Sequence, residues 1–185
     1  WGSNDVILFV AKPNTGLSQI SAAGGTPSPV TTLDSAAGET RHWWPSFLPD
    51  GQHFLYEVVG SKTGGGNDPQ TVRIGSLNSN ERSRPLLQGG SNAKYARGYV
   101  LFMRERTLMA QPFDTTRLAL SGQAMAVAER VNFVRGLPAT GTLAAFVVSD
   151  PGVLVFESWR TSRLVWFDRA GKQTEILGDP ARYGS

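Results

Sequence analysis

The sequence contains no cysteine and only two histidines among its 185 residues. Without cysteine there can be no disulfide bond, no thiol nucleophile and no thiolate metal ligand. Two histidines are too few for a histidine-rich metal site, so we expect neither a metal nor a cofactor. A cysteine-free chain suits a reducing cytosol and a periplasm equally well, and its absence therefore does not identify a compartment.

The sequence also lacks a long apolar run and any cluster of like charges. No segment approaches the roughly 20 apolar residues that a membrane-spanning helix needs, so we expect no direct membrane insertion. The formal net charge is +3, but the Lys and Arg residues are scattered. Nucleic-acid-binding proteins gather these residues on one face, and those that bind single strands interleave them with aromatic residues. We therefore expect no nucleic-acid partner.

Glycine and proline are plentiful, at 21 and 11 residues, and 40% of the chain is hydrophobic. This composition indicates a folded chain with many turns and few long helices. The organising stretch is SFLPDGQHFLYEV at residues 46–58. Two segments rich in strand-forming residues flank Pro49, Asp50 and Gly51, which are the residue types of a tight hairpin turn.

Weaker copies of this hairpin recur along the chain. Equivalent turns stand at residues 150–152, 97–98 and 4–5, and the second strands of the copies are centred about 45 to 55 residues apart. Each copy reads as four short strands, and such a unit at this spacing predicts a β-propeller. A sandwich or barrel also fits short strands, but these folds seldom repeat one turn at one place. The turn residues predicted to be structural are Pro49, Asp50, Gly51, Asp150, Pro151 and Gly152.

The predicted fold is therefore all-β, with residues 1–185 forming one propeller domain of about four four-stranded antiparallel blades. The blades are expected at residues 1–34, 41–88, 93–131 and 141–178. Both ends of the chain fall within strand-like patterns, so we expect a part of a longer protein that forms a partial ring or half of a larger ring. Open strand edges favour pairing, and a homodimer through these edges is one arrangement that would cover them.

The repeats resemble a known family. Leu48-Pro49-Asp50-Gly51 before Phe54-Leu55-Tyr56, with residues 17–20 leading to Gly24-Gly25, resembles the WD40-like (PD40) repeat of TolB-type β-propellers. Segments 98–114 and 164–172 are similar to a narrower group, the propellers carried C-terminal to bacterial Ser/Thr protein kinases. The resemblance covers nearly the whole chain, although residues 4–5 and 97–98 depart from the motif.

The resemblance implies a non-catalytic module that binds a protein, peptide or cell-wall-derived ligand. Such a module would be the sensor or interaction region of a kinase-type receptor or of a TolB-like protein, and any kinase chemistry would belong to another domain. The resemblance also favours a periplasmic or extracytoplasmic location. The alternative is the propeller of a larger prolyl-oligopeptidase-type hydrolase, in which the ring gates access to the active site.

Candidate binding residues follow from the expected geometry, in which the connections between blades share one face around a central channel. Aromatic and arginine side chains dominate binding hot spots, and several cations at a channel mouth favour an anionic ligand or an acidic partner. Packing between blades would also explain the tryptophans, and ordinary solvated charges would explain the cations. The candidates are Arg41, His42, Trp43, Trp44, Asn92, Lys94, Arg104, Arg106, Arg135, Trp159 and Arg160.

Two patterns that look catalytic have simpler explanations. Asp50 and Asp150 could form an acid–base pair, but they occupy equivalent turns of different repeats and should lie far apart. Ser91 and Lys94 have the spacing of penicillin-recognising enzymes, which requires a helix where this segment predicts a loop entering a strand. We therefore predict no catalytic residues, and we expect His53 only to pack beside its turn.

Overall fold

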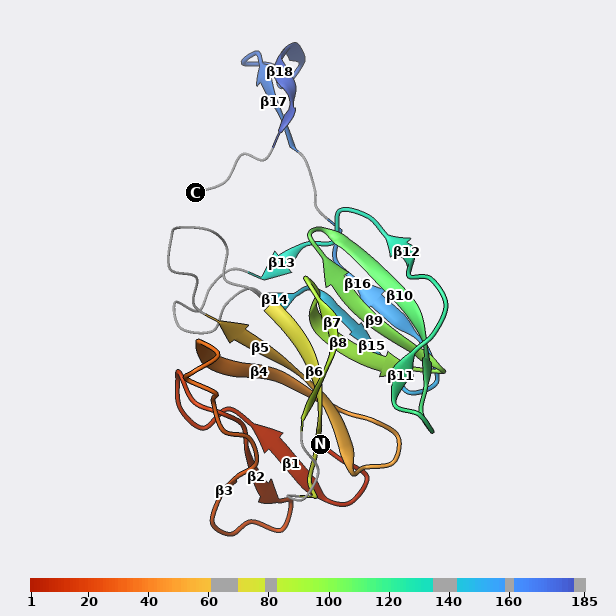
Figure 1. Cartoon of the computed structure of the whole chain (residues 1–185). Coiled ribbons are helices and arrows are strands. Elements are labelled where there is room, and N and C mark those ends of the chain that lie inside the picture. The colour runs from red at the N-terminus through yellow and green to blue at the C-terminus, as the bar shows by residue number, and fades with distance from the viewer. Residues whose placement is uncertain (61–69, 79–82, 135–142, 159–161, 182–185) are drawn as a thin grey trace.

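The computed structural model describes residues 1–60, 70–78, 83–134, 143–158 and 162–181, which form strands joined by turns (Figure 1). Every regular element in these ranges is a β-strand. The prediction of an all-β fold is confirmed. Within the same ranges, no helix is long and apolar enough to cross a membrane.

The first two sheets follow the chain in order. The first contains β1 (Val6–Phe9), β2 (Ser18–Ser21) and β3 (Ser28–Pro29), with β1 and β3 at its edges. Proline in an edge strand breaks no ladder hydrogen bond on the outer side. The second sheet is a four-stranded antiparallel meander made of β4 (Glu39–Phe47), β5 (His53–Gly60), β6 (Gln70–Ser76) and β7 (Arg84–Gln88).

The third sheet has the same order with one addition. It contains β8 (Ser91–Ala96), β9 (Tyr99–Arg104), β10 (Thr107–Asp114) and β11 (Ala119–Leu120), and β12 (Met125–Ala128) also pairs with β10. The sequence therefore predicts the repeated meander correctly in the second and third sheets.

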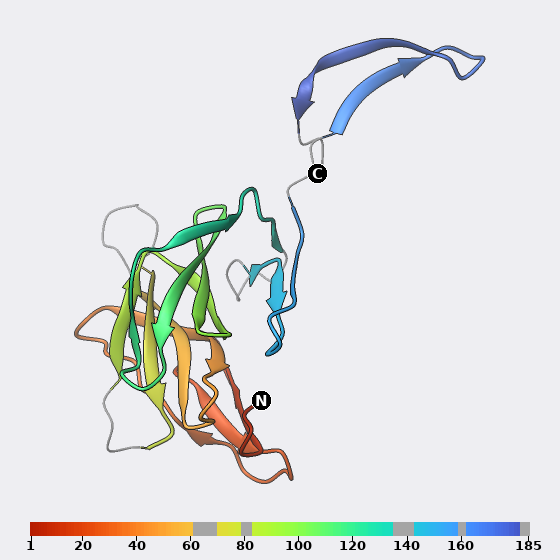
Figure 2. The same cartoon turned by 90° about the vertical axis from the view of Figure 1, so that its right-hand side faces the viewer.

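The fourth predicted blade is not a single sheet. Its region contains three strand pairs, β13 (Phe133–Val134) with β14 (Leu143–Ala144), β15 (Phe146–Val148) with β16 (Leu154–Phe156), and β17 (Ser162–Phe167) with β18 (Gln173–Ala181). The first two pairs are connected by the bridge between Val131 and Ser158. Neither β17 nor β18 pairs with any other described strand, and their hairpin stands apart in both views (Figures 1 and 2). The described sheets form no closed ring, so the four-blade prediction holds only in part.

Successive sheets pack face to face, and β5 shows the sequence pattern that allows this. Phe54, Tyr56 and Val58 belong to a core shared with Leu8 of the first sheet. Leu55 lies on the opposite face, in a core shared with the third sheet. All residues from 54 to 59 are buried, because a strand covered on both faces needs apolar side chains at successive positions.

The third sheet repeats this arrangement. Val100 and Phe102 of β9 join the core toward the second sheet. Leu101 and Met103 alternate with them and pack with Phe146 of β15. The described sheets from β1 to β16 are thus stacked in chain order, with an apolar core between neighbours.

Both predicted hairpin turns are present, in different sheets. Oδ1 of Asp50 accepts the backbone amides of Gln52 and His53 at 2.9 Å each, and Gly51 has a left-handed φ of 65°. The second carboxylate oxygen of Asp50 lies 2.6 Å from Nδ1 of His53, so His53 makes a hydrogen bond beyond the packing expected of it. In the other turn, the amide of Gly152 donates to the carbonyl of Ser149 at 2.8 Å.

Candidate binding site

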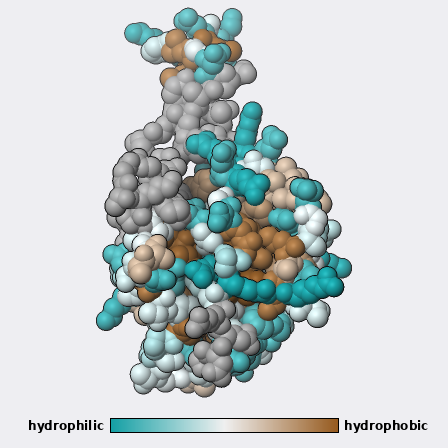
Figure 3. Space-filling model, in the orientation of Figure 1, coloured by the Kyte–Doolittle hydropathy of each residue, from teal (hydrophilic) through white to brown (hydrophobic). Residues whose placement is uncertain are grey.

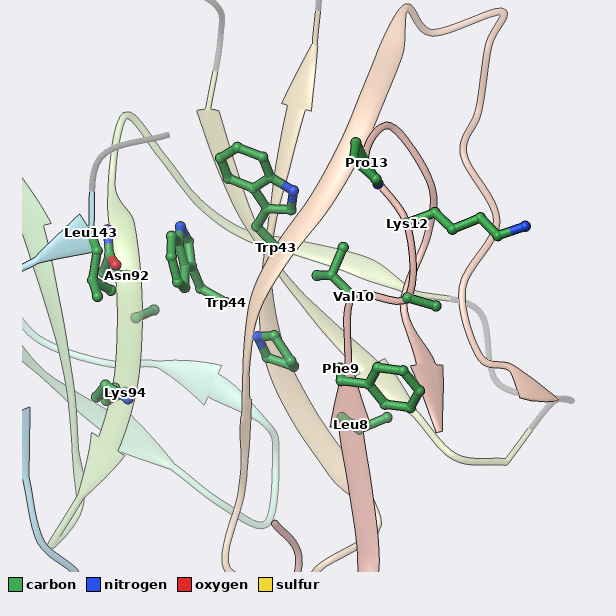
Figure 4. A pocket seen from close by; sticks show the side chains of 13 residues that line it. Leu8, Phe9, Val10, Lys12, Pro13, Trp43, Trp44, Asn92, Lys94 and Leu143 are labelled. Carbon is green, nitrogen blue, oxygen red and sulfur yellow. The ribbon is translucent and has the colours of Figure 1, made fainter. Parts of the chain in front are cut away.

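A cavity of about 450 Å³ lies among strands β4, β8 and β14 and the C-terminal end of β1 (Figure 4). Four of the predicted binding residues line it, namely Trp43, Trp44, Asn92 and Lys94. The other lining residues are Leu8, Phe9, Val10, Ala11, Lys12, Pro13, Pro45, Ala93 and Leu143, which the sequence did not single out. Mainly apolar and aromatic side chains therefore surround a few polar groups, which is the usual composition of a ligand site.

Trp44 and Asn92 lie at equivalent β-bulges. The register between β4 and β5 shifts between Trp43 and Ser46, and that between β8 and β9 shifts between Ser91 and Lys94. In each strand, two residues stand opposite one residue of the partner strand.

Both bulge residues, Trp44 and Asn92, have a φ of 53°. Residues other than glycine rarely adopt this left-handed conformation, and a bulky aromatic residue does so least readily. In Figure 4, Trp44 points toward Asn92 and Leu143 across the cavity. The bulges thus direct two side chains from neighbouring sheets toward one space, at a cost in backbone strain at Trp44.

The two tryptophans have different surroundings. Trp43 is buried, and the guanidinium carbon of Arg41 lies 4.6 Å from the centre of its ring. Trp44 is half-buried, and its ring meets that of Trp43 edge-on with 5.9 Å between centroids. Trp43 and Arg41 therefore pack against each other beside the cavity, while Trp44 supplies the accessible aromatic surface.

Lys94 supplies a cation without a neutralising partner among the described residues. Its side chain is half-buried, and this burial lowers the pKa of its ammonium group below the ordinary value. The ammonium group makes no hydrogen bond or ion pair with another described residue, and no Asp or Glu lines the cavity. A partly desolvated ammonium group without a counter-charge is destabilised, so an anionic ligand would bind favourably here.

Glu57 contacts two residues that line the cavity, Trp43 and Asn92, and was not among the sequence candidates. It stands opposite Trp43 in the β4–β5 ladder. Its Oε2 accepts the backbone amide of Asn92 at 3.2 Å. Burial raises the pKa of Glu57 to about 7, while the Asn92 hydrogen bond and the charge of Arg41 act in the opposite direction. One acidic residue inside the apolar run of β5 was the sequence signal that could have revealed it.

His42 requires a correction, because it is buried rather than placed on an exposed binding face. Its Nδ1 lies 2.8 Å from Oγ1 of Thr31, and its Nε2 lies 3.0 Å from Oε2 of Glu39. Burial lowers the pKa of His42, although Glu39 acts in the opposite direction. The other oxygen of Glu39 accepts a hydrogen bond from Arg73 at 3.0 Å. His42 therefore belongs to the polar network that joins the first and second sheets.

The remaining candidates do not line the cavity. Arg104 and Arg106 are exposed at the β9–β10 turn, and the guanidinium carbon of Arg104 lies 5.5 Å from the ring centre of Phe102. Three candidates, Arg135, Trp159 and Arg160, lie outside the described residues. In the described ranges, no group of His, Cys, Asp and Glu side chains is arranged to hold a metal ion.

The arrangement thus combines aromatic side chains, a partly desolvated cation and two β-bulges, of which that at Trp44 is strained, at a cavity between sheets. Its chemistry suits recognition of a ligand that carries both an apolar part and a negative charge. Comparison of the chain with family models, with characterised proteins and with solved structures gave no match.

Proposed function

We propose that this chain is a non-catalytic binding module built from consecutive blades of a β-propeller. The support for this architecture is the stacking of successive antiparallel sheets in chain order, with the second and third sheets sharing one meander order. The inner strands β4 and β8 lie side by side at the cavity. Propellers place their ligand sites around such inner strands.

We further propose that the cavity binds an acidic segment of a partner protein or peptide. The observation that carries this proposal is the convergence of Trp44 and Lys94 on one cavity from two neighbouring sheets. An aromatic ring provides apolar contact area, and a desolvated ammonium group favours a carboxylate.

The biological setting proposed for the module is the sensor or interaction region of a bacterial kinase-type receptor or of a TolB-like protein outside the cytoplasm. The support for this setting is the resemblance of the repeat sequences. In such a setting, the module binds its partner and a different domain carries any catalytic activity.

Three matched peptides test the binding proposal. They have the sequence Ala-Val-X-Val-Thr-Ala, are acetylated and amidated, and carry Glu, Gln or Lys at X. Binding is measured by tryptophan fluorescence and calorimetry. We expect the Glu peptide to bind about tenfold more tightly than the Gln peptide, because a hydrogen bond to a charged group contributes more than a neutral one.

The variant Lys94→Met should remove this preference, while the exposed control Lys172→Met should retain it. Equal affinity for all three peptides would overturn the proposal, as would an unchanged preference in Lys94→Met.

A further inference from the structure

Glu57 brings a carboxyl group from β5 to residues that line the cavity. Leu55 and Glu57 share a face of β5, because side chains two positions apart on a strand point the same way. Leu55 packs in the core toward the third sheet, and Oε2 of Glu57 accepts the backbone amide of Asn92 in that sheet. Glu57 also stands opposite Trp43 in the β4–β5 ladder. Both of these neighbours, Trp43 and Asn92, line the cavity.

The hydrogen bond from Asn92 connects this carboxyl group to the bulge of β8. The register between β8 and β9 shifts between Ser91 and Lys94, so the bulge sets how the strand presents Asn92 and Lys94 to the cavity. A bond to a backbone amide within the bulge fixes its position relative to β5. Glu57 is therefore a positioning residue, which acts on a ligand through the residues that would touch it.

Few charged groups surround the side chain of Glu57, which is buried between the sheets. On β4, the guanidinium charge of Arg41 favours the ionised carboxylate. On β6, the residue opposite Glu57 is the apolar Val72, and the adjacent Arg73 points to the other face of the sheet. On β8, the one charged residue is Lys94. Burial outweighs these charges and raises the pKa of Glu57 to about 7, so its charge changes near neutral pH.

We propose that Glu57 couples ligand binding to a proton, which its carboxyl group takes up when an anionic ligand enters the cavity. This inference rests on the proposed function and specifies how binding is regulated. A carboxylate bound beside Lys94 brings a second negative charge to the cavity, and a nearby like charge favours the protonated form of a carboxyl group. Binding therefore raises the pKa of Glu57, and by linkage the ligand binds more tightly when Glu57 is protonated.

The affinity for an acidic ligand should consequently fall as the pH rises through neutrality. Below about pH 6, Glu57 is protonated with or without ligand, and its repulsion is absent. At higher pH, the ligand must either overcome the repulsion or bring a proton with it. A repulsion that raises the pKa of Glu57 by about one unit lowers the affinity about tenfold across this window.

The Glu and Gln peptides described above test this linkage in the full chain. Their affinities are measured by calorimetry at pH 6.5 and pH 8.5 for the parent and for Glu57→Gln. Gln keeps an acceptor for the amide of Asn92 but cannot ionise. We expect Glu57→Gln to bind the Glu peptide about five- to tenfold more tightly than the parent at pH 8.5, and within about twofold at pH 6.5.

Two controls separate this effect from a general change of charge or structure. The Gln peptide adds no negative charge, so the parent and Glu57→Gln should bind it equally at pH 8.5. Glu105→Gln removes a carboxylate from an exposed turn, and this variant should bind the Glu peptide as the parent does. A gain in affinity at pH 8.5 is also the opposite of what a lost structural support would produce.

The number of protons taken up gives a second readout. Calorimetry of the Glu peptide in two buffers with different ionisation enthalpies measures this number. At pH 7.5, the parent should take up about half a proton more than Glu57→Gln. Any uptake by Lys94 remains in both proteins, so the difference belongs to Glu57. His42 has a pKa below 6.5 and therefore titrates below this window.

The linkage and the proposed function fail in different ways. If the Glu peptide binds through Lys94 but Glu57→Gln changes neither its affinity at pH 8.5 nor the proton uptake, the linkage is wrong and the anionic site stands. A lower affinity of Glu57→Gln for both peptides at both pH values would also overturn the linkage, because it indicates a structural role alone. If the parent binds neither peptide at pH 6.5, the proposed function itself is wrong and the linkage falls with it.

Discussion

Glu57 accepts the backbone amide of Asn92 across the interface between the second and third sheets, with 3.2 Å between Oε2 and the nitrogen. Its side chain is buried, and burial raises its pKa from 4.5 to about 7. Between these two pH values the folded chain binds more protons at Glu57 than the unfolded chain does. The free energy of unfolding therefore falls as pH rises through this window.

Replacing Glu57 with Gln should remove most of this pH dependence. Gln keeps the size of the side chain and an acceptor oxygen for Asn92, but it carries no charge to bury. We expect Glu57→Gln to raise the free energy of unfolding by up to about 3 kcal/mol at pH 8 and to change it little at pH 4. Urea denaturation at both pH values measures this. A parallel loss of stability with pH in both proteins would contradict the assignment.

His42 titrates with the opposite sign. Because burial lowers its pKa below 6.5, the unfolded chain binds more protons at this residue in the affected range. Its stabilising contribution is therefore fully present above pH 6.5 and is lost as the pH falls through the lowered folded pKa. In the Glu57→Gln protein, this remaining dependence should appear as a loss of stability on acidification.

The network around His42 can be tested without changing the cavity. Oγ1 of Thr31 accepts the amide of Leu17 at 2.7 Å and lies 2.8 Å from Nδ1 of His42. Thr31→Val should lower the free energy of unfolding by about 1 to 3 kcal/mol because it leaves buried partners unsatisfied. The control Thr116→Val, at an exposed turn, should change it little. Loss of peptide binding without loss of stability in Thr31→Val would show that His42 contributes to binding rather than to stability.

Because the backbone at Trp44 is strained, replacing this residue should affect peptide binding and stability differently. A left-handed φ costs a residue other than glycine about 1 to 2 kcal/mol, so Trp44→Gly relieves strain while it removes aromatic surface. We expect its unfolding free energy to stay within about 1 kcal/mol of the parent and its peptide affinity to fall. Trp43→Gly should instead lose about 3 to 5 kcal/mol, because that side chain is buried. Equal destabilisation by both changes, measured by denaturation, would show that Trp44 only packs.

The predictions that the structure confirms concern local or strongly patterned features. Asp50 and Gly51 form their turn through contacts within a few residues, so residue type alone identifies it. Trp43 and Lys94 line one cavity, and both lie where one repeat passes to the next, but their role in binding stays a prediction.

The missed features depend on contacts between segments far apart in the sequence. A bulge is set by the register between two strands, and Trp44 and Asn92 share no local signal that marks one. The role of Glu57 requires the neighbouring sheet, and His42 lies among residues from other segments, with Thr31 at its Nδ1 and Tyr56 edge-on to its ring. In the last repeat, each hairpin forms from local pattern, but joining the hairpins into one sheet is a long-range event.

The hairpin of β17 and β18 leads to the last prediction. Apolar side chains occupy both of its faces, since Trp166 lies on one face and Ile176, opposite Val165, lies on the other. Trp166 and Ile176 are 57% and 50% exposed, and apolar surface is visible on this hairpin in Figure 3. An isolated two-stranded hairpin is at best marginally stable in water. In the assembled protein, both faces should therefore be covered.

We propose that a second copy of the chain covers them. Sedimentation velocity over a range of concentrations should then show dimers, and the double change Leu164→Ser with Trp166→Ser should shift the distribution to monomers. Val127→Ser on β12, another exposed apolar residue, is the matched control and should leave the dimer intact. A mass of one chain at every concentration would contradict this proposal.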